Sequence, residues 1–227
     1  MTKREDIRKR RNKQTSNQRW IIILIIALGA IGVAAILIAP SLAPIGEIAT
    51  IKAIQRPSVN GNSMGDPKAP VKVEVYTDFQ CPACKIYSDR YEPSLLTEYI
   101  AKGKVYYTSH SFSFIGEESF RAAEAAYCAM DQERYWDYHD LLYANQTGEN
   151  IGDFKDRRLV AFAETLGLNM ENFKSCFNSG KYKQRVLDEY ADGEKRGVTG
   201  TPTLFVNNKQ IKTGDLFKVI DDLLKTN

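Results

Sequence analysis

The sequence predicts an α/β domain that follows one membrane-spanning helix. Three features carry this prediction: an apolar run over residues 20–39, a strand–helix–strand pattern over 71–110, and a strand hairpin with a final helix over 203–225. A βαβ unit joined to a hairpin and a helix can form one four-stranded sheet with helices on both faces. Residues 117–197, which lie between these two parts, show helical patterns and no strand pattern.

The apolar run contains no charged residue, and its only hydrogen-bonding side chain is the indole of Trp20. Twenty helical residues extend about 30 Å, which is the thickness of the hydrocarbon core of a bilayer. A soluble helix would need a polar face, and the apolar part of a signal peptide is shorter, at about 7–15 residues. We therefore expect residues 20–39 to be an uncleaved membrane anchor.

Charge is unevenly distributed along the chain. The first nineteen residues hold eight basic and two acidic residues, a net charge of +6, whereas the whole chain carries +3. By the positive-inside rule, residues 1–19 form a cytoplasmic tail and the chain beyond the anchor lies outside the cytoplasm. The exported part is mildly acidic, which argues against a nucleic-acid partner. Disulfides form and persist in that compartment.

Residues 40–69 lack sustained periodicity and contain four prolines, so they are predicted to be a linker before a domain at 70–227. Within the domain we expect strands at 71–77 and 104–110, and between them a helix over 82–101 that Pro93 kinks. The remaining predicted elements are helices near 117–130, 132–145, 154–166, 170–178 and 181–196, a hairpin of 203–206 and 210–212 around Asn207-Asn208, and a helix at 215–225.

The segment Cys81-Pro82-Ala83-Cys84 lies where the first strand gives way to a helix. The N–H groups and dipole of a helix N-terminus favour an anion, so the pKa of Cys81 should fall below the usual value of about 8.5. Cys84 lies one turn further on the same side, and Pro82 suits the first helical position. These positions predict thiol–disulfide exchange, with Cys81 as the exposed reactive thiol and Cys84 as the thiol that resolves a mixed disulfide.

Zinc binding is the competing explanation for a CxxC pair. A structural zinc site normally uses two such pairs, and this chain has one. The other ligands would have to be Cys128 and Cys176, which lie 48 residues apart on predicted helices. His110 and His139 have no partners at ligand spacing. We therefore expect no metal, and no motif in the sequence calls for a cofactor.

Three features occur in an order that resembles the DsbA-like branch of the thioredoxin superfamily: YTDFQCPAC after a strand, a helical region, and GVTGTPT before the last hairpin. The resemblance runs from about Pro67 to the C-terminus. It implies a thioredoxin fold, with a four- to five-stranded mixed sheet and an inserted helical subdomain at about 117–197. It also implies a cis peptide bond before Pro202, with Thr201 offering backbone groups to the substrate chain.

The same resemblance implies a protein thiol:disulfide oxidoreductase that acts on the thiols and disulfides of exported proteins. Its redox partner would be a membrane protein, either a quinone-linked reoxidase or a reductase. Oxidation of substrate dithiols is the favoured direction. The alternatives are an extracytoplasmic reductase or isomerase, and a peptide-binding or chaperone module whose disulfide is incidental.

Two departures from the family pattern leave the direction of electron flow open. Family members often have a buried acid six residues before the first cysteine, and that position is Val75 here. Glu74 is adjacent but should point to the other face of the strand. The dipeptide Pro82-Ala83 also lacks the histidine of strongly oxidising members, which removes one group that stabilises the thiolate.

Cys128 and Cys176 both lie in the helical region. Two buried free thiols, a structural disulfide and a second redox relay are the possible interpretations. Unpaired thiols would be vulnerable to oxidation in an exported domain, so the structural disulfide is favoured. Some family members carry a second pair in this region. A bond between these two residues would close a loop of 48 residues, which is worth about 4 kcal/mol on entropic grounds.

Overall fold

The structure, a computed structural model, describes residues 20, 23–34 and 44–226. It comprises two units, Met1–Gly46 and Glu47–Asn227. In the first unit Trp20 and residues 23–34 are helical, while the predicted basic tail and the rest of the predicted anchor lie outside the described residues. Among the described residues, no helix has the length and apolar character that a membrane crossing requires.

The second unit is built on a five-stranded mixed sheet in the order β1-β3-β2-β4-β5. Its central strand β2, Val71–Thr77, runs parallel to β3, Val105–Ser111, and antiparallel to β4, Thr203–Val206. Each of these partners matches a predicted strand to within one residue. The β-branched residues of β2 are fully buried, because this strand is paired on both edges and covered on both faces.

The fifth strand corrects the expected linker. β1, Ser63–Met64, pairs antiparallel with β3, and the preceding chain is also held to the domain. Asn145 accepts a hydrogen bond from the Ala49 N–H at 2.8 Å and donates one to the Ala49 carbonyl at 3.0 Å. Residues 47–69 therefore belong to the domain. They lack periodicity because single side chains and a two-residue strand attach them.

The helix after the reactive segment is broken where proline was expected to bend it. α2, Pro82–Arg90, is followed by α3, Glu92–Leu95, and by a π-helical turn η1, Leu96–Ile100. Proline has no N–H with which to continue the helical bonding, so the chain adjusts around Pro93. The wider final turn brings the chain to β3 and completes the βαβ crossover.

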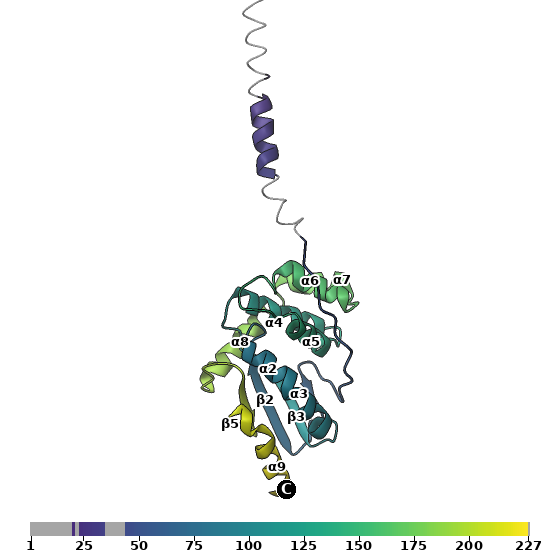
Figure 1. Cartoon of the computed structure of the whole chain (residues 1–227), viewed down its shortest axis with the longest axis vertical. Helices are drawn as coiled ribbons and strands as arrows, with labels where there is room; N and C mark the ends of the chain where they lie inside the picture. The colour runs from purple at the N-terminus through teal and green to yellow at the C-terminus, as the bar shows by residue number, and fades with distance from the viewer. Residues whose placement is uncertain (1–19, 21–22, 35–43, 227) are drawn as a thin grey trace, which may run out of the picture. The chain divides into compact units, whose positions relative to one another are not determined.

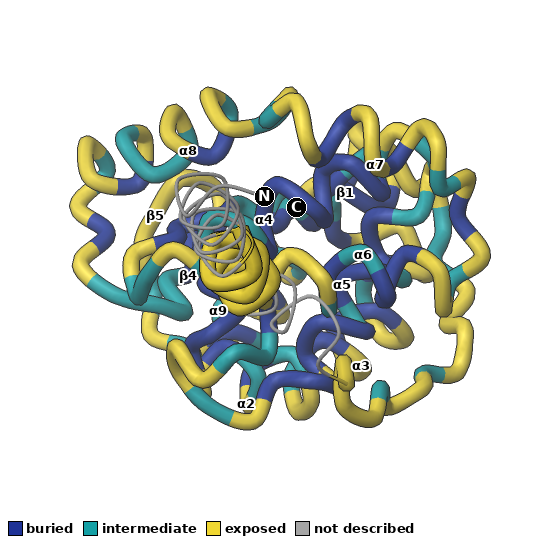
Figure 2. Tube along the Cα trace, turned by 90° about the horizontal axis from the view of Figure 1, so that it is seen from above, coloured by how far each residue is buried: buried dark blue, intermediate teal, exposed yellow. Residues whose placement is uncertain are grey.

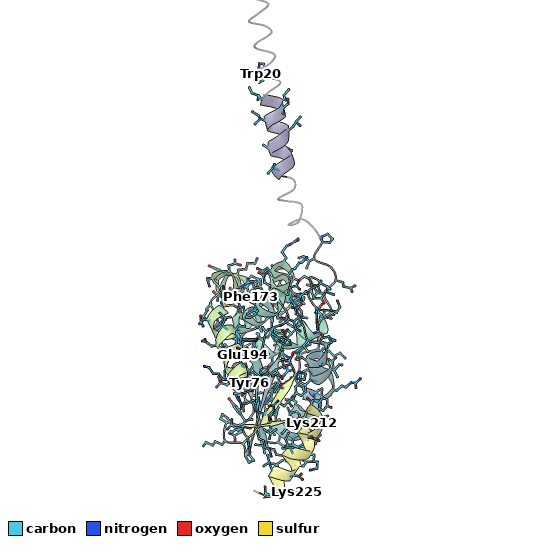
Figure 3. All side chains as sticks on the ribbon, turned by 90° about the vertical axis from the view of Figure 1, so that its left-hand side faces the viewer. Trp20, Tyr76, Phe173, Glu194, Lys212 and Lys225 are labelled. Carbon is cyan, nitrogen blue, oxygen red and sulfur yellow. A yellow bond between two sulfur atoms is a disulfide. The ribbon has the colours of Figure 1, made fainter. Side chains whose placement is uncertain are left out.

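Five helices form the insertion between β3 and β4: α4 Glu117–Met130, α5 Tyr135–Ala144, α6 Asp156–Thr165, α7 Met170–Ser179 and α8 Lys183–Lys195. α4 is alanine-rich and buried along most of its length, and it packs against the other four helices. Aromatic side chains fill the space around it, Phe173 of α7 among them (Figure 3). Figure 1 shows α4 to α7 gathered beyond one end of the sheet, opposite α9 and the C-terminus.

α8 returns the chain to the sheet and is mostly exposed, as its outer turns show in Figure 2. Its close approach requires Gly193, because a Cβ there would lie 2.6 Å from the ring of Phe112. Arg196, just beyond the helix, makes a bidentate ion pair with Glu74 of β2 at 2.9 and 3.0 Å. Figure 3 labels Tyr76 and Glu194 on the two elements that meet here.

The C-terminal part follows the predicted order. β4 turns into β5, Lys209–Ile211, through Asn207 and Asn208, whose φ angles of 46° and 64° suit a tight hairpin turn. A 3₁₀ turn η2, Thr213–Asp215, leads into α9, Leu216–Thr226. α9 packs against β2 and β4, which covers a second part of the sheet.

Candidate active site

The reactive segment forms the start of α2. Cys81 is the N-cap, its N–H donates to the Asp78 carbonyl, and its own carbonyl accepts the Cys84 N–H at 3.0 Å. Both cysteines are free, with no disulfide between them. Cys81, which was expected to be exposed, is largely covered at 8% exposed, and Cys84 is fully buried, so Cys81 is the more accessible of the two. Pro82 and Ala83 lie between them at the surface.

The two thiols have opposite acidities. The pKa of Cys81 is lowered to about 6, mainly because the Cys84 thiol hydrogen-bonds to its sulfur. Burial opposes this shift, while Thr201 and the N–H groups of Ala83 and Cys84 add to it. Burial raises the pKa of Cys84 well above that of an ordinary thiol, and the neighbouring Cys81 sulfur raises it further. At neutral pH the pair therefore consists of one thiolate and one thiol.

The loop before β4 completes the site. The Thr201–Pro202 peptide bond is cis, as the resemblance implies. The Thr201 carbonyl oxygen lies 3.3 Å from the Cys81 sulfur. The structure thus brings together two segments that are 120 residues apart in the chain. An extended peptide that bonded to the backbone at Thr201 would have its own sulfur close to Cys81.

Neither Val75, which occupies the position of the usual family acid, nor its neighbour Glu74 can exchange a proton with Cys84. Val75 is buried and pairs with Leu204 of β4. Glu74 points to the other face of β2, as expected, where His110 and Arg196 bind it. The hydrogen bond from His110, followed by Arg196, lowers the pKa of Glu74 to about 2 despite partial burial.

Asp78, which was not predicted from the sequence, organises the turn before Cys81. Its fully buried carboxylate accepts hydrogen bonds from the N–H groups of Gln80, Phe114 and Ile115 and from the Ser119 hydroxyl, at 2.6 to 3.1 Å. An acid three residues before a helix N-cap was the available signal. Three of its four partners, however, lie more than 30 residues away, in the loop after β3 and at the start of α4.

A second connection joins the same turn to the insertion. The Gln80 side chain accepts the Asn150 N–H at 2.6 Å and donates to the Ser119 hydroxyl at 2.9 Å. The two loops held in this way carry Phe114 and Ile151, which are 47% and 61% exposed. Large apolar side chains are therefore presented on loops that the turn before Cys81 fixes in place.

A further group that was not predicted from the sequence surrounds Glu92 at the start of α3. The side chain is buried, and its carboxylate accepts hydrogen bonds from the Tyr107 hydroxyl at 2.8 Å and the Ser88 hydroxyl at 2.9 Å. Nε2 of the fully buried His139 lies 3.7 Å from the same carboxylate. The sequence did not mark Glu92 as a buried acid, because a single acid in a predicted helix is usually part of its solvent-exposed face.

A disulfide joins Cys128 of α4 to Cys176 of α7, with their Cα atoms 5.8 Å apart. Both residues are buried, so the bond lies inside the helical insertion. This is the pairing that the sequence analysis favoured. It removes these two sulfurs as thiolate ligands, and the described residues hold no cluster of three His, Cys, Asp or Glu side chains suited to a metal.

Comparison with known proteins agrees with this geometry. Residues 58–225 match the family described as thioredoxin. A probable disulfide bond formation protein D of Bacillus cereus is 36% identical over 172 residues, which cover 72% of this chain and 78% of that protein. The disulfide bond formation protein D of Bacillus subtilis is 30% identical over 182 residues, covering 75% and 78%. The chain belongs to the DsbA-like branch of the thioredoxin superfamily.

Solved structures of similar fold support the same family assignment. Oxidised BdbD from Bacillus subtilis superposes with a TM-score of 0.67 at 26% identity, over 79% of this chain and all of that one. DsbA of Chlamydia trachomatis gives 0.64 at 23% identity, over 78% and 99%, and shows the shared fold. The thioredoxin fold with an inserted helical subdomain, predicted from the sequence, is confirmed.

Proposed function

We propose that this DsbA-like protein is a thiol:disulfide oxidoreductase that oxidises dithiols of exported proteins. One observation carries the proposal: a low-pKa Cys81 lies one turn before a buried Cys84 and 3.3 Å from the carbonyl that precedes a cis-proline. Cys81 would react with the substrate sulfur, and Cys84 would form or release the disulfide bond to Cys81. Thr201 and Pro202 would hold the substrate chain.

The reaction proceeds in two exchanges. A substrate thiolate attacks Cys81 in the Cys81–Cys84 disulfide, which forms a mixed disulfide and releases Cys84. The second substrate thiolate then attacks the substrate sulfur of that bond and releases Cys81 as a thiolate. Two electrons pass from the substrate to the protein, and the substrate gains a disulfide.

The acidity of Cys81 supports the direction of oxidation. A thiol with a pKa of about 6 is a good leaving group in the second exchange and is ionised at neutral pH. Stabilising the reduced form in this way makes the disulfide more oxidising. The relatives from Bacillus are named for disulfide bond formation, which agrees with this direction.

The membrane location rests on the sequence. Residues 1–19 would be a cytoplasmic tail, residues 20–39 the anchor, and residues 40–46 a short tether to an extracytoplasmic catalytic domain. The reduced protein would pass its electrons to a membrane partner, a quinone-linked reoxidase. If the protein instead ran as a reductase or isomerase, the partner would be a membrane reductase that keeps Cys81 and Cys84 reduced.

Three measurements test this proposal. Cys84→Ala should accumulate mixed disulfides with exported proteins, because the resolving thiol is missing, whereas Cys81→Ala/Cys84→Ala should trap none. Equilibration with glutathione gives the reduction potential of the pair. A value near the −270 mV of thioredoxin would rule out the oxidising direction. Full activity in Cys81→Ser would show that the protein acts as a binding module instead.

A further inference from the structure

The loop that carries Thr201 begins where α8 ends and leads into β4. Residues 197–202 form this loop, and the Thr201 carbonyl oxygen near its end lies 3.3 Å from the Cys81 sulfur. In the proposed function, on which this inference rests, a substrate chain binds to this backbone while its sulfur reacts with Cys81. The rate of exchange with a protein substrate therefore depends on where the loop holds Thr201.

We propose that Arg196 is a positioning residue for the substrate chain, because it attaches both ends of this loop to the central strand of the sheet. Arg196 is the C-cap of α8 and directly precedes the loop. Its guanidinium donates to both carboxylate oxygens of Glu74 in β2, at 2.9 and 3.0 Å. A bidentate pair of this kind fixes the orientation of the guanidinium as well as its position. The start of the loop is thereby held on β2.

The same guanidinium contacts the strand that follows the loop. Its central carbon lies 4.0 Å from the centre of the Phe205 ring, and Phe205 lies in β4, three residues after Pro202. A cation within about 6 Å of an aromatic ring centre is attracted to the ring. Glu74 and Phe205 are paired directly across β2 and β4, so the ion pair and the ring contact lie at one place on the sheet.

Tyr76 and its neighbours restrict the guanidinium further. Nη1 of Arg196 donates to the Tyr76 hydroxyl at 3.0 Å, and this hydroxyl donates to Asp192 of α8. His110 lies 3.2 Å from the Glu74 carboxylate and stacks on the Tyr76 ring. The guanidinium is thus held by groups from β2, β4 and α8 together, which suits a residue that sets the position of a loop between two of these elements.

The first part of the loop transmits this position along the backbone. The Gly197 N–H donates to the Glu194 carbonyl at 3.0 Å, and the Val198 N–H donates to the Gly193 carbonyl at 2.9 Å. With Gly197 at a φ of 82°, these two bonds form the turn that ends a helix in a fixed direction. Val198 is buried in the apolar cluster between α8 and the sheet. A shift of Arg196 would therefore move the chain as far as Val198.

The last part of the loop is attached to β4 in a similar way. The Thr203 hydroxyl donates to the Gly200 carbonyl at 2.7 Å, which closes a short turn around Thr201 and Pro202. Thr203 is also paired with Tyr76 at the end of the β2–β4 ladder. Thr201 therefore lies between two segments that Arg196 holds together.

The experiment compares two dithiols on the oxidised full-length chain. An unstructured peptide with two cysteines has a backbone that can bind along the loop, whereas dithiothreitol has no backbone and reacts at Cys81 alone. The second-order rate constant for oxidation of each dithiol is measured by stopped flow. A residue that only stabilises the fold would affect the two rate constants alike, so their ratio reports positioning of the substrate chain.

Four variants use the contacts of the guanidinium. Arg196→Gln removes the ion pair, and Arg196→Lys keeps a charge beside Glu74 without the two parallel hydrogen bonds. Glu74→Gln removes the acceptor side of the same pair. Arg56→Gln breaks another ion pair, the one in which Arg56 bonds both oxygens of Asp140 at 2.8 Å, and is the matched control.

We expect Arg196→Gln to lower the rate constant for the peptide at least tenfold and to leave that for dithiothreitol within about twofold, since misplacing a positioning group by about 1 Å can cost about 10²-fold. Arg196→Lys should recover part of the rate. Glu74→Gln should show the same selective loss, and adding it to Arg196→Gln should cost little more, because both changes break one contact. Arg56→Gln should alter neither rate constant.

An equal loss with both dithiols would overturn the proposal, because Arg196 would then act only on the stability of the fold. Unchanged oxidation of the peptide by Arg196→Gln, or a selective loss in Arg56→Gln, would overturn it as well. If Arg196→Gln does not fold, Arg196→Lys carries the same test. Failure of the proposed function would look different, because the unmodified protein itself would then leave the peptide dithiol reduced, whatever residue occupies position 196.

Discussion

At the residue scale, the difference in acidity between two neighbouring thiols defines the site. The hydrogen bond from Cys84 lowers the pKa of the outer thiol, while burial, and after it the same contact, raises the pKa of the inner thiol. The Pro-Ala dipeptide supplies no cation, so the thiolate depends mainly on hydrogen bonds from Cys84 and from the helix N-terminus.

The first prediction concerns the ionisation of Cys81. In the reduced protein, the rate of alkylation of Cys81 should rise with pH about a midpoint near 6, because only the thiolate reacts. In Cys84→Ala the midpoint should move upward, toward the ordinary value of about 8.5, since the largest stabilising contact is removed. Mass spectrometry after timed alkylation gives both midpoints. Identical midpoints in the two proteins would show that Cys84 does not stabilise the thiolate.

Asp78 gives a second prediction at this scale. Asp78→Asn replaces an acceptor oxygen with an NH₂ group, which would face two of the four donors that the carboxylate now satisfies. Leaving buried donors without acceptors should lower the free energy of unfolding by about 2 kcal/mol or more. Urea denaturation measures the change. Asp89→Asn, at an exposed site on α2, is the control and should alter the value by less than about 0.5 kcal/mol.

The residues that the sequence predicted and those it missed differ in a physical way. Cys81, Cys84 and Pro202 lie in short motifs whose local geometry follows from their neighbours in the chain. Asp78 and Glu92 act through partners on other elements, the loop after β3 and β3 itself. A single sequence does not show which distant side chains meet a carboxylate, so these roles became visible only in the fold.

At the scale of elements, the bounds of periodic segments were predicted to within a few residues. Short elements that depend on isolated contacts were not predicted. β2 and α4 coincide with their predicted ranges, because alternation and helical spacing are properties of the segment itself. β1 was missed, since two residues cannot show a period. The π-helical turn after Pro93 was also missed, because only a kink follows from the proline.

The disulfide between α4 and α7 leads to the third prediction. Cys128→Ala/Cys176→Ala should lower the free energy of unfolding by about 4 kcal/mol, because the unfolded chain regains the freedom of a 48-residue loop. The reduction potential of the Cys81–Cys84 pair should stay the same, since the bond lies inside the insertion. Guanidinium denaturation and glutathione equilibration measure the two quantities. A changed potential would indicate a redox relay between the pairs.

At the scale of the whole molecule, the redox state and the stability of the fold are linked through the same thiols. Oxidation removes both titrating groups of the active site, so the oxidised and reduced proteins differ in pH dependence by the contribution of Cys81 and Cys84 alone. Other ionisable groups, such as the Glu74–Arg196 pair that ties α8 to the sheet, are common to both forms and cancel in the comparison.

The fourth prediction uses this difference. The folded pKa of Cys81, about 6, lies below the unfolded value of about 8.5, so its contribution to stability is present above the unfolded pKa and is lost as pH falls toward 6. The raised pKa of Cys84 acts in the opposite sense, but only above about pH 8.5. From pH 5.5 to 8, the melting temperature of the reduced protein should therefore rise relative to that of the oxidised protein.

Calorimetry on both forms tests this, with mass spectrometry to verify that the Cys128–Cys176 bond remains intact. Cys81→Ala in the reduced state is the control, and its melting temperature should lose most of the extra pH dependence. If the reduced and oxidised curves instead ran parallel across this range, Cys81 would have the same pKa in the folded and unfolded chain. The thiolate could then supply no driving force for oxidising substrates, and the direction of electron flow would have to come from the redox partner.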